Sequence, residues 1–285
     1  LLGRIAGKKC GVKRVIYQAH GFHFYKGAPL VNWLVYYPVE RWLARHTDAL
    51  ITINKADYDL AVRRFRLRNQ GKVYYVPGVG VDLDRFRRQT VERDLLRRSF
   101  GVGPKDIMLI TMGELVVGKN YQVAIEAVAR AKLPHLKYVI CGNGPDLERL
   151  KRIAETLGVS SQVIFLGYRS DIKELLEVAD IFLFTSLREG LPRSMMEAMA
   201  SGLPCIASKI RGNSDLISDG VGGFLCNPTD VAAFAHAITV LTKDRELRHR
   251  MGQYNLKAIA DFDVSKVREA LVNVYVREFC GTTTE

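Results

Sequence analysis

The sequence predicts an α/β protein in which helices cover parallel sheets, organised as two domains. Apolar segments rich in β-branched residues alternate with segments of helical periodicity along the chain, a pattern typical of parallel sheets. Glycine-bearing turns follow several of the apolar segments, at the sheet edge where such folds bind ligands. At 285 residues, the chain is long enough for about two domains.

The sequence of residues 1–100, the first third of the chain, predicts only part of a domain. We expect three strands and two helices there, with the strands at 12–17, 49–53 and 72–76 and the helices at 30–45 and 55–66. A doubly wound sheet ordinarily has more strands than this. Leu1–Gly7 also has the pattern of a helix interior. We therefore expect roughly 80 to 100 residues with the first strands of this domain to precede Leu1 in the full-length protein.

The sequence of residues 101–263, the second domain, predicts a complete doubly wound sheet. Glycine and proline interrupt the periodicity at Phe100–Lys105, where we expect the boundary. Six strands are expected, at 107–112, 136–141, 162–166, 181–184, 204–207 and 223–226. Four helices are expected between them, at 121–131, 146–157, 171–178 and 193–200.

The segment Glu189–Glu197 predicts a binding site for an anion that also carries hydroxyl groups. Pro192 stands at the start of a helix, so the amides of the three following residues are free to face an anion, aided by the helix dipole. Glu189 on the loop and Glu197 within the helix supply carboxylates that accept from hydroxyls. The alternative is a surface helix whose glutamates are only solvated.

The same segment resembles a known donor-site signature. Glu189-Gly-Leu-Pro192, followed by Glu197-Ala-Met-Ala-Ser-Gly-Leu-Pro204, is similar to that of retaining glycosyltransferases of the group-1 family. Further matching motifs occur in the family's order, at 142–145, 165–168, 210–217, 219–225 and 228–230. The resemblance implies the GT-B fold, in which two doubly wound, Rossmann-like domains face a cleft. It also implies that residues 264–285, with a helix at 264–279, return to the first domain as a closing helix.

Lys119 is the candidate cation for the donor's diphosphate. It follows a predicted strand and matches the family's diphosphate-binding lysine, and a fixed cation there stabilises the departing phosphate. A solvated lysine at a helix start is the alternative. Glu114 departs from the family, because most relatives have arginine after Gly113. Either Glu114 contacts substrate hydroxyls, or a nearby arginine such as Arg193 neutralises it.

The positions of other residues on loops, in the helix and after strands predict the remaining donor contacts. Glu189 is expected to bind the sugar ring and Glu197 the ribose. Asn143, Gly144, Tyr168 and Arg169 follow predicted strands and are expected to line the base pocket. The other residues expected to contact the nucleotide sugar are Gly113, Gly190, Leu191, Pro192 and Arg193.

His20 is the candidate residue of the first domain. It follows the strand expected at 12–17 and matches the family's His-Gly histidine, which lies against the donor sugar. Its imidazole is able to donate a hydrogen bond to a sugar hydroxyl or to stabilise charge, and we do not assign it as a base. Position after a strand alone favours a structural histidine, and we expect that structural role for His23.

Charge and aromatic residues predict a surface for anionic partners. The net charge is +12, and residues 1–100 hold all of the excess, with 20 Lys and Arg against 8 Asp and Glu. Such a surface attracts lipid headgroups, acidic substrates or nucleic acid, unless it is only a solvated face. Because no nucleic-acid-binding motif accompanies it, we expect no nucleic-acid partner. Leu30–Arg45 combines aromatic and basic residues, which suits a lipid headgroup layer, although core packing is the alternative.

The cysteines indicate the cellular compartment, and Lys119 indicates whether a metal is needed. Five cysteines are scattered without a Cys-x-x-Cys pair, which fits a reducing cytoplasm and argues against zinc. We expect no metal or other cofactor, because Lys119 and backbone amides take the place of a divalent cation. The chain has no apolar run of the ~18 residues needed to cross a bilayer. We therefore expect a cytoplasmic protein, peripheral at the inner membrane face.

The resemblance implies a retaining hexosyl- or N-acetylhexosaminyltransferase. The expected donor is a UDP-sugar and the expected acceptor a lipid-linked saccharide, in exopolysaccharide or capsule synthesis. A subgroup of the family that acts in exopolysaccharide synthesis is similar in having Glu-Leu at this turn, followed by Lys-Asn. Two alternatives remain, a nucleotide-sugar epimerase and a non-catalytic nucleotide-sugar-binding module.

Overall fold

The computed structural model describes residues 2–87 and 91–280, and the last residues of the expected closing segment, 281–285, lie outside this part. The chain divides into two compact units. The first comprises residues 1–80 and 264–285, and the second comprises residues 81–263.

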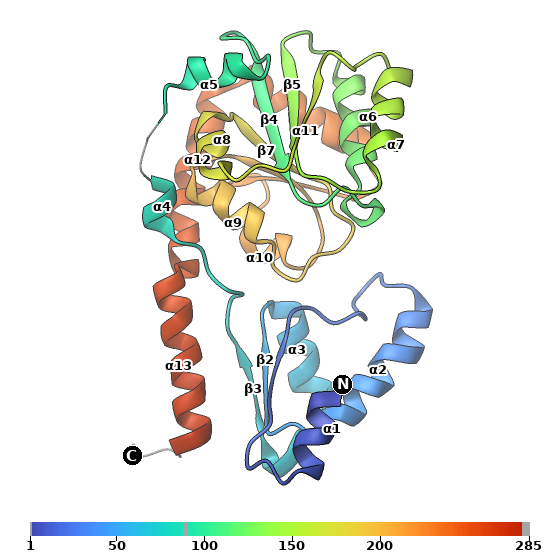
Figure 1. The fold of residues 1–285 in the computed structure, drawn as a ribbon, viewed down its shortest axis with the longest axis vertical. Helices are drawn as coiled ribbons and strands as arrows, with labels where there is room; N and C mark the ends of the chain where they lie inside the picture. Colours follow the sequence, from blue (N-terminus) through green and yellow to red (C-terminus); the bar gives the residue numbers. More distant parts are fainter. Residues whose placement is uncertain (1, 88–90, 281–285) are drawn as a thin grey trace. The chain divides into compact units, whose positions relative to one another are not determined.

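The first unit is built on a small parallel sheet (Figure 1). The strand order is β1-β2-β3, with β1 Ile16–Ala19, β2 Ala49–Thr52 and β3 Lys72–Tyr75. The surrounding helices are α1 Leu2–Lys9, α2 Leu30–Ala44, α3 Lys55–Arg64, the 3-10 turn η1 Arg68–Gln70 and α13 Val264–Cys280.

Alternation along β2 separates the two faces of this sheet. Leu50 joins an aromatic cluster beneath α2 and α3, whereas Ile51 packs with Val267 and Val274 of α13. The helices α2 and α3 therefore cover one face and α13 covers the other, as Figure 1 shows. The chain after residue 263 thus groups with the N-terminal strands.

The second unit contains a six-stranded parallel sheet with the order β6-β5-β4-β7-β8-β9. The strands are β4 Ile107–Met112, β5 Leu136–Cys141, β6 Val163–Gly167, β7 Ile181–Phe184, β8 Cys205–Ser208 and β9 Gly223–Cys226. The first three strands extend the sheet in one direction and the last three in the other. The order therefore reverses between β4 and β7, and sheets of this kind bind ligands at that point, beyond the carboxyl ends of the strands.

Helices cover both faces of this sheet. Figure 1 shows α6, α7 and α11 on one side and α8, α9 and α12 on the other. Their bounds are α6 Tyr121–Ala131, α7 Leu147–Thr156, α8 Ile172–Val178, α9 Arg193–Ala200, α11 Val231–Lys243 and α12 Arg245–Ala258. The shorter elements are α4 Leu83–Arg87, α5 Arg93–Ser99, η2 Val117–Lys119, α10 Asn213–Leu216 and η3 Ile259–Phe262.

Residues 81–100 group with the second unit, although the sequence places the boundary at Phe100–Lys105. Arg97 of α5 is one residue that links them to this unit, and only 2% of its surface is exposed. Its guanidinium donates to the Asp180 carboxylate at 3.0 Å and to the Val178 carbonyl at 3.2 Å. Leaving a buried guanidinium without these acceptors is costly, so α5 is anchored to the second sheet.

Besides the short helices α4, α5 and α10, the longer helices α11 and α12 are absent from the elements expected from the sequence. Both α11 and α12 begin at an aspartate that caps the helix, Asp230 accepting from the Ala233 amide and Asp244 from the Leu247 amide, at 2.9 and 2.8 Å. Such caps are readable from sequence. The strand expected at 12–17 also begins later, because the Val15 amide bonds to the Asp48 side chain and ladder pairing starts at Ile16.

Candidate active site

Lys119 and Glu189 form an ion pair where the order of the second sheet reverses. Lys119 ends η2, in the loop after β4, and Glu189 lies in the loop after β7. The Lys119 Nζ donates to the Glu189 Oε1 at 2.7 Å and lies 5.4 Å from the centre of the Phe184 ring. The two side chains retain 28% and 15% exposure, so an incoming anion is able to reach the ammonium group.

Backbone and hydroxyl contacts fix these two loops against each other. The Thr185 hydroxyl lies 3.2 Å from the Lys119 carbonyl and 2.9 Å from that of Asn120, and the Leu187 amide donates to the Gly118 carbonyl at 2.9 Å. Asn120 adopts the left-handed conformation, with φ 56°, which asparagine tolerates well. The position of the Lys119 main chain is therefore set before any ligand arrives.

The start of α9 presents the free amides that the sequence predicts. The first intrahelical bond joins the Met196 amide to the Pro192 carbonyl at 3.3 Å. The amides of residues 193–195 precede this bond and so lack an acceptor within the helix. Pro192 occupies the cap with extended geometry, φ −76° and ψ 118°.

Glu197 is paired within its own helix. The Arg193 Nε donates to the Glu197 Oε1 at 2.9 Å, with the two side chains 62% and 14% exposed. The structure thus joins Lys119 to Glu189 and places Glu197 in a separate pair. Because Arg193 bonds to Glu197, the structure does not show Arg193 as the group that neutralises Glu114.

The turn that carries Gly190, Leu191 and Pro192 packs tightly on the segment before α10. Gly212 has a φ of 78°, and a Cβ there would lie 2.4 Å from the Gly190 carbonyl oxygen. Leu191 is buried, with 9% exposure. The turn before α9 is therefore held by close backbone contact.

A pocket of about 390 Å³ opens at the carboxyl ends of β4, β5 and β6. The sequence identified four of its lining residues, Gly113, Asn143, Tyr168 and Arg169, and the pocket also includes Glu114. Gly144 is not among the lining residues. A Cβ at Gly144 would lie 2.3 Å from the Leu115 carbonyl oxygen, so its role is to let two loops approach. The remaining lining residues are Met112, Cys141, Gly142 and Ile172.

These four residues were not predicted from the sequence as pocket residues, although the position of each at a strand end or helix start could have indicated it. Met112 and Cys141 end the strands β4 and β5, Gly142 follows β5 directly, and Ile172 begins α8. Parallel sheets bring the carboxyl ends of neighbouring strands together. Strand-end residues, and not only the glycine turns, are therefore candidates for the lining.

Arg169 of this pocket is paired with a neighbouring carboxylate. The Arg169 Nε donates to the Asp171 carboxylate at 2.8 Å, and this hydrogen bond lowers the pKa of Asp171. Burial raises the pKa of Cys141 to about 12, against the opposing effect of Arg169. The Cys141 thiol is therefore protonated at neutral pH and acts as an apolar wall of the pocket.

Gly142 allows the loops after β4 and β5 to meet. Its φ is 149°, and a Cβ there would lie 1.9 Å from the Gly113 carbonyl oxygen. The Gly142 amide donates to the Gly167 carbonyl at 2.7 Å, which links the same point to β6. Any larger residue would displace the pocket floor.

His20 lies in the first unit, directly after β1, and is exposed. Its loop is held by the buried carboxylate of Asp57, which accepts from the Phe22 amide at 3.0 Å. Asn54 caps α3 by accepting from the Asp57 amide at 2.8 Å, so the His20 loop and α3 share one anchor. The His23 ring packs on Tyr36, with the ring centres 4.7 Å apart.

Residues 2–87 and 91–280 offer neither a metal-binding cluster nor a membrane-spanning helix. Within these residues, His, Cys, Asp and Glu side chains form no group of three or more suited to hold a metal ion. Among the same residues, no helix combines the length and the apolar character that a membrane span needs.

Residues 92–258 match the family described as glycosyl transferases group 1, and this match covers more than half of the chain. The chain therefore belongs to the group-1 glycosyltransferases.

Several relatives named as glycosyltransferases match nearly the whole chain. The putative glycosyltransferase EpsD of Bacillus subtilis is 41% identical over 281 residues, which cover 96% of this chain and 73% of EpsD. The UDP-Gal:alpha-D-GlcNAc-diphosphoundecaprenol alpha-1,3-galactosyltransferase of Escherichia coli is 30% identical, over 97% of this chain and 72% of that enzyme.

Solved structures confirm the GT-B fold. Anabaena Alr3699/HepE in complex with UDP and glucose has a TM-score of 0.83 at 22% identity, covering 96% of this chain and 74% of that one. Sucrose-phosphate synthase from Thermosynechococcus elongatus has a TM-score of 0.81 at 18% identity, covering 99% and 72%. At this level of identity, the likeness concerns the fold.

Proposed function

We propose that this group-1 glycosyltransferase transfers a hexose or N-acetylhexosamine from a UDP-sugar to a lipid-linked saccharide, with retention, in exopolysaccharide or capsule synthesis. The Lys119–Glu189 pair, 2.7 Å across the reversal point of the sheet, carries this proposal. The names of relatives support it, since the E. coli enzyme is named for a UDP-sugar and a diphosphoundecaprenol acceptor. The Anabaena structure holds UDP and glucose.

In this proposal the bound donor breaks the Lys119–Glu189 and Arg193–Glu197 ion pairs and takes their place. The diphosphate takes the Lys119 ammonium and the free amides at the start of α9, and Glu189 is released to accept from the sugar hydroxyls. Glu197 accepts from the ribose after exchanging its bond with Arg193. The uracil occupies the pocket lined by Asn143, Tyr168 and Arg169, with Glu114 at its edge.

The chemistry requires one bond exchange on one face of the sugar. The bond between the anomeric carbon and the phosphate oxygen breaks, and the acceptor hydroxyl oxygen bonds to that carbon from the same side. The departing phosphate accepts the hydroxyl proton. Lys119 stabilises the charge that develops on the phosphate, which is why we propose no metal cofactor. His20 is proposed to donate a hydrogen bond to a hydroxyl of the transferred sugar.

A transfer assay tests this function. The full chain is incubated with UDP-sugars and a short-chain sugar-diphosphate-polyprenol, and the product is identified by mass and by the anomeric proton coupling in NMR. We expect an extended lipid-linked saccharide with the donor's configuration. Sugar interconversion without acceptor would instead indicate an epimerase. UDP binding without turnover on any acceptor would indicate a binding module.

A peripheral position at the inner membrane face is supported by the outer surface of α2. Leu30, Val31, Leu34 and Val35 of this helix are between 51% and 80% exposed. Arg41 on the same helix and Arg45, directly after its end, are exposed as well. Exposed aliphatic residues beside cations suit an interface with an anionic bilayer.

We expect Leu34→Gln to weaken the binding of the chain to phosphatidylglycerol-containing vesicles by about tenfold, because an exposed leucine that enters a bilayer contributes about 1.5 kcal/mol or more. Vesicle cosedimentation measures this. Leu95→Gln is the matched control, since Leu95 is similarly exposed, at 68% against 76%, but lies on α5. Equal vesicle binding by both variants would contradict a role for α2.

A further inference from the structure

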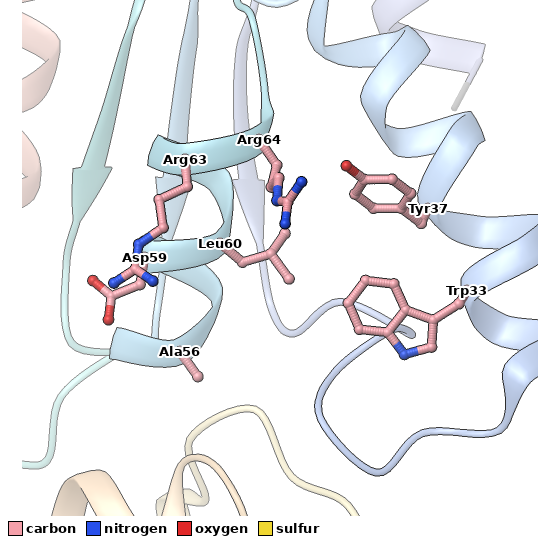
Figure 2. Close-up of a pocket in the computed structure, with 7 residues that line it drawn as sticks. All are labelled: Trp33, Tyr37, Ala56, Asp59, Leu60, Arg63 and Arg64. Carbon is pink, nitrogen blue, oxygen red and sulfur yellow. The ribbon is translucent and has the colours of Figure 1, made fainter.

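A second pocket lies within the first unit, between α2 and α3. Its volume is about 510 Å³, and we call it the α2–α3 pocket. Figure 2 shows Leu60 and Arg64 projecting from α3 toward the rings of Trp33 and Tyr37 on α2, with Arg63 beside Asp59. The residues that line it are Trp33, Tyr37, Ala56, Asp59, Leu60, Arg63 and Arg64.

The aromatic wall of this pocket is fixed in place. The Trp33 indole N–H donates to the Tyr25 carbonyl at 3.2 Å. The Trp33 and Tyr37 rings both pack on the buried Phe24, with ring centres 5.5 and 5.3 Å apart. Because the donor group of Trp33 is already satisfied, what its ring offers to a ligand is apolar surface.

The opposite wall is cationic. Arg63 and Arg64 are exposed at the end of α3, and Asp59 is the one acidic group among the lining residues. A ligand at this place would therefore meet two guanidinium groups against one carboxylate, and guanidinium groups bind phosphate oxygens in bidentate fashion.

We propose that the α2–α3 pocket binds the diphosphate and the first isoprenoid units of the acceptor's lipid carrier. A polyprenyl diphosphate joins a strongly anionic group to an apolar chain, and this pocket joins guanidinium groups to an aromatic wall. The same helix, α2, exposes aliphatic residues on its outer side, so a lipid that leaves the bilayer there meets the pocket at headgroup depth. This inference rests on the proposed lipid-linked acceptor and deepens it.

Intrinsic fluorescence gives a direct readout, because both tryptophans of the chain, Trp33 and Trp42, lie on α2. Trp33 lines the α2–α3 pocket, whereas Trp42 does not. In the Trp42→Phe variant, farnesyl diphosphate is therefore expected to change the emission of Trp33. In the Trp33→Phe variant, the emission of Trp42 should stay close to its value without ligand. The reverse pattern would overturn the assignment.

A charge variant tests the polar half of the pocket. We expect Arg64→Gln to weaken farnesyl diphosphate binding by roughly tenfold, as loss of a charged hydrogen-bond donor ordinarily does. Arg66→Gln removes the same charge from an exposed residue outside the pocket lining, so its effect should stay within about twofold. Equal weakening in both variants would overturn the pocket and indicate unspecific attraction.

Two probes separate the lipid from free phosphate. Inorganic diphosphate carries the charge alone, so we expect it to bind more weakly than farnesyl diphosphate. Equal affinity of the two would overturn the isoprenoid part of the proposal. UDP binding, which depends on the second unit, serves as the folding control and should be unchanged in every variant.

The transfer assay keeps this proposal distinct from the proposed function. Arg64→Gln should raise the acceptor KM about tenfold and leave kcat unchanged, because it removes binding that ground state and transition state share. If the variant is active and its acceptor KM is unchanged, the assignment of the α2–α3 pocket to the lipid carrier is wrong. The transferase assignment is not affected by that result. Absence of transfer by the unmodified chain, with Arg64-dependent farnesyl diphosphate binding intact, would instead count against the proposed function.

Discussion

Replacing Lys119 with glutamine is expected to lower kcat/KM for sugar transfer by about 10²–10³-fold, the usual effect of removing one electrostatic group that stabilises developing charge. The Lys119 ammonium is the cation that the structure places at the reversal point of the sheet, 2.7 Å from Glu189. Steady-state transfer assays with saturating acceptor measure the loss. Thermal unfolding should change little, because a partly exposed ion pair contributes about 1 kcal/mol or less.

Lys151→Gln is the matched control for this variant. Lys151 forms an ion pair of similar length with Glu148, at 2.9 Å, but on the exposed surface of α7. Its loss should leave transfer unchanged. Normal turnover in Lys119→Gln, or an equal loss in both variants, would remove Lys119 from the reaction.

Replacing Gly142 with alanine is expected to destabilise the second unit by about 3 kcal/mol or more, since strain at positive φ and overpacking act together. The new Cβ would lie 1.9 Å from the Gly113 carbonyl oxygen, so the loops after β4 and β5 must separate. The melting temperature should fall by roughly 10 °C. UDP affinity should fall as well, because Gly142 and Gly113 both line the pocket assigned to the base.

Gly118→Ala is the stability control. A Cβ at Gly118 meets nothing within 4 Å, and its φ is not positive. Its unfolding temperature should therefore stay close to that of the unmodified chain. A Gly142→Ala protein that melts with the unmodified chain would show that the close approach of Gly142 to Gly113 is not needed.

Strong periodicity made much of this fold predictable. The strands expected at 107–112, 136–141, 181–184 and 223–226 have those bounds in the structure. Each is a short apolar run ended by polar or turn residues, which leaves little freedom in where a buried strand begins and ends. The helix expected at 193–200 also has those bounds, because proline marks its start and glycine follows its end.

Side-chain pairing was less accessible from sequence. The sequence assigns Lys119 to the diphosphate and Glu189 to the sugar, and the ion pair between them depends on loop conformations set by Thr185 and Asn120. Glu197 was expected to face the ribose, and the structure pairs it with Arg193 four residues earlier. Which ion pairs form in the absence of ligand depends on which charged side chains lie closest together. The patterns that predict strands and helices do not contain this information.

The domain boundary shows a similar limit. Glycine and proline at Phe100–Lys105 mark a break in periodicity, but Arg97 reaches across to Asp180 and binds residues 81–100 to the second unit. An ion pair that joins residues 83 positions apart leaves no local pattern in the sequence. Long-range contacts of this kind decide where a compact unit begins.

A crystal structure of the chain with a bound UDP-sugar tests the central claim most directly. We expect the terminal phosphate of the UDP moiety within about 3 Å of the Lys119 Nζ. We also expect the Glu189 carboxylate to have moved from Lys119 to the sugar hydroxyls. A nucleotide sugar bound elsewhere, with the Lys119–Glu189 pair still closed at 2.7 Å, would contradict the account.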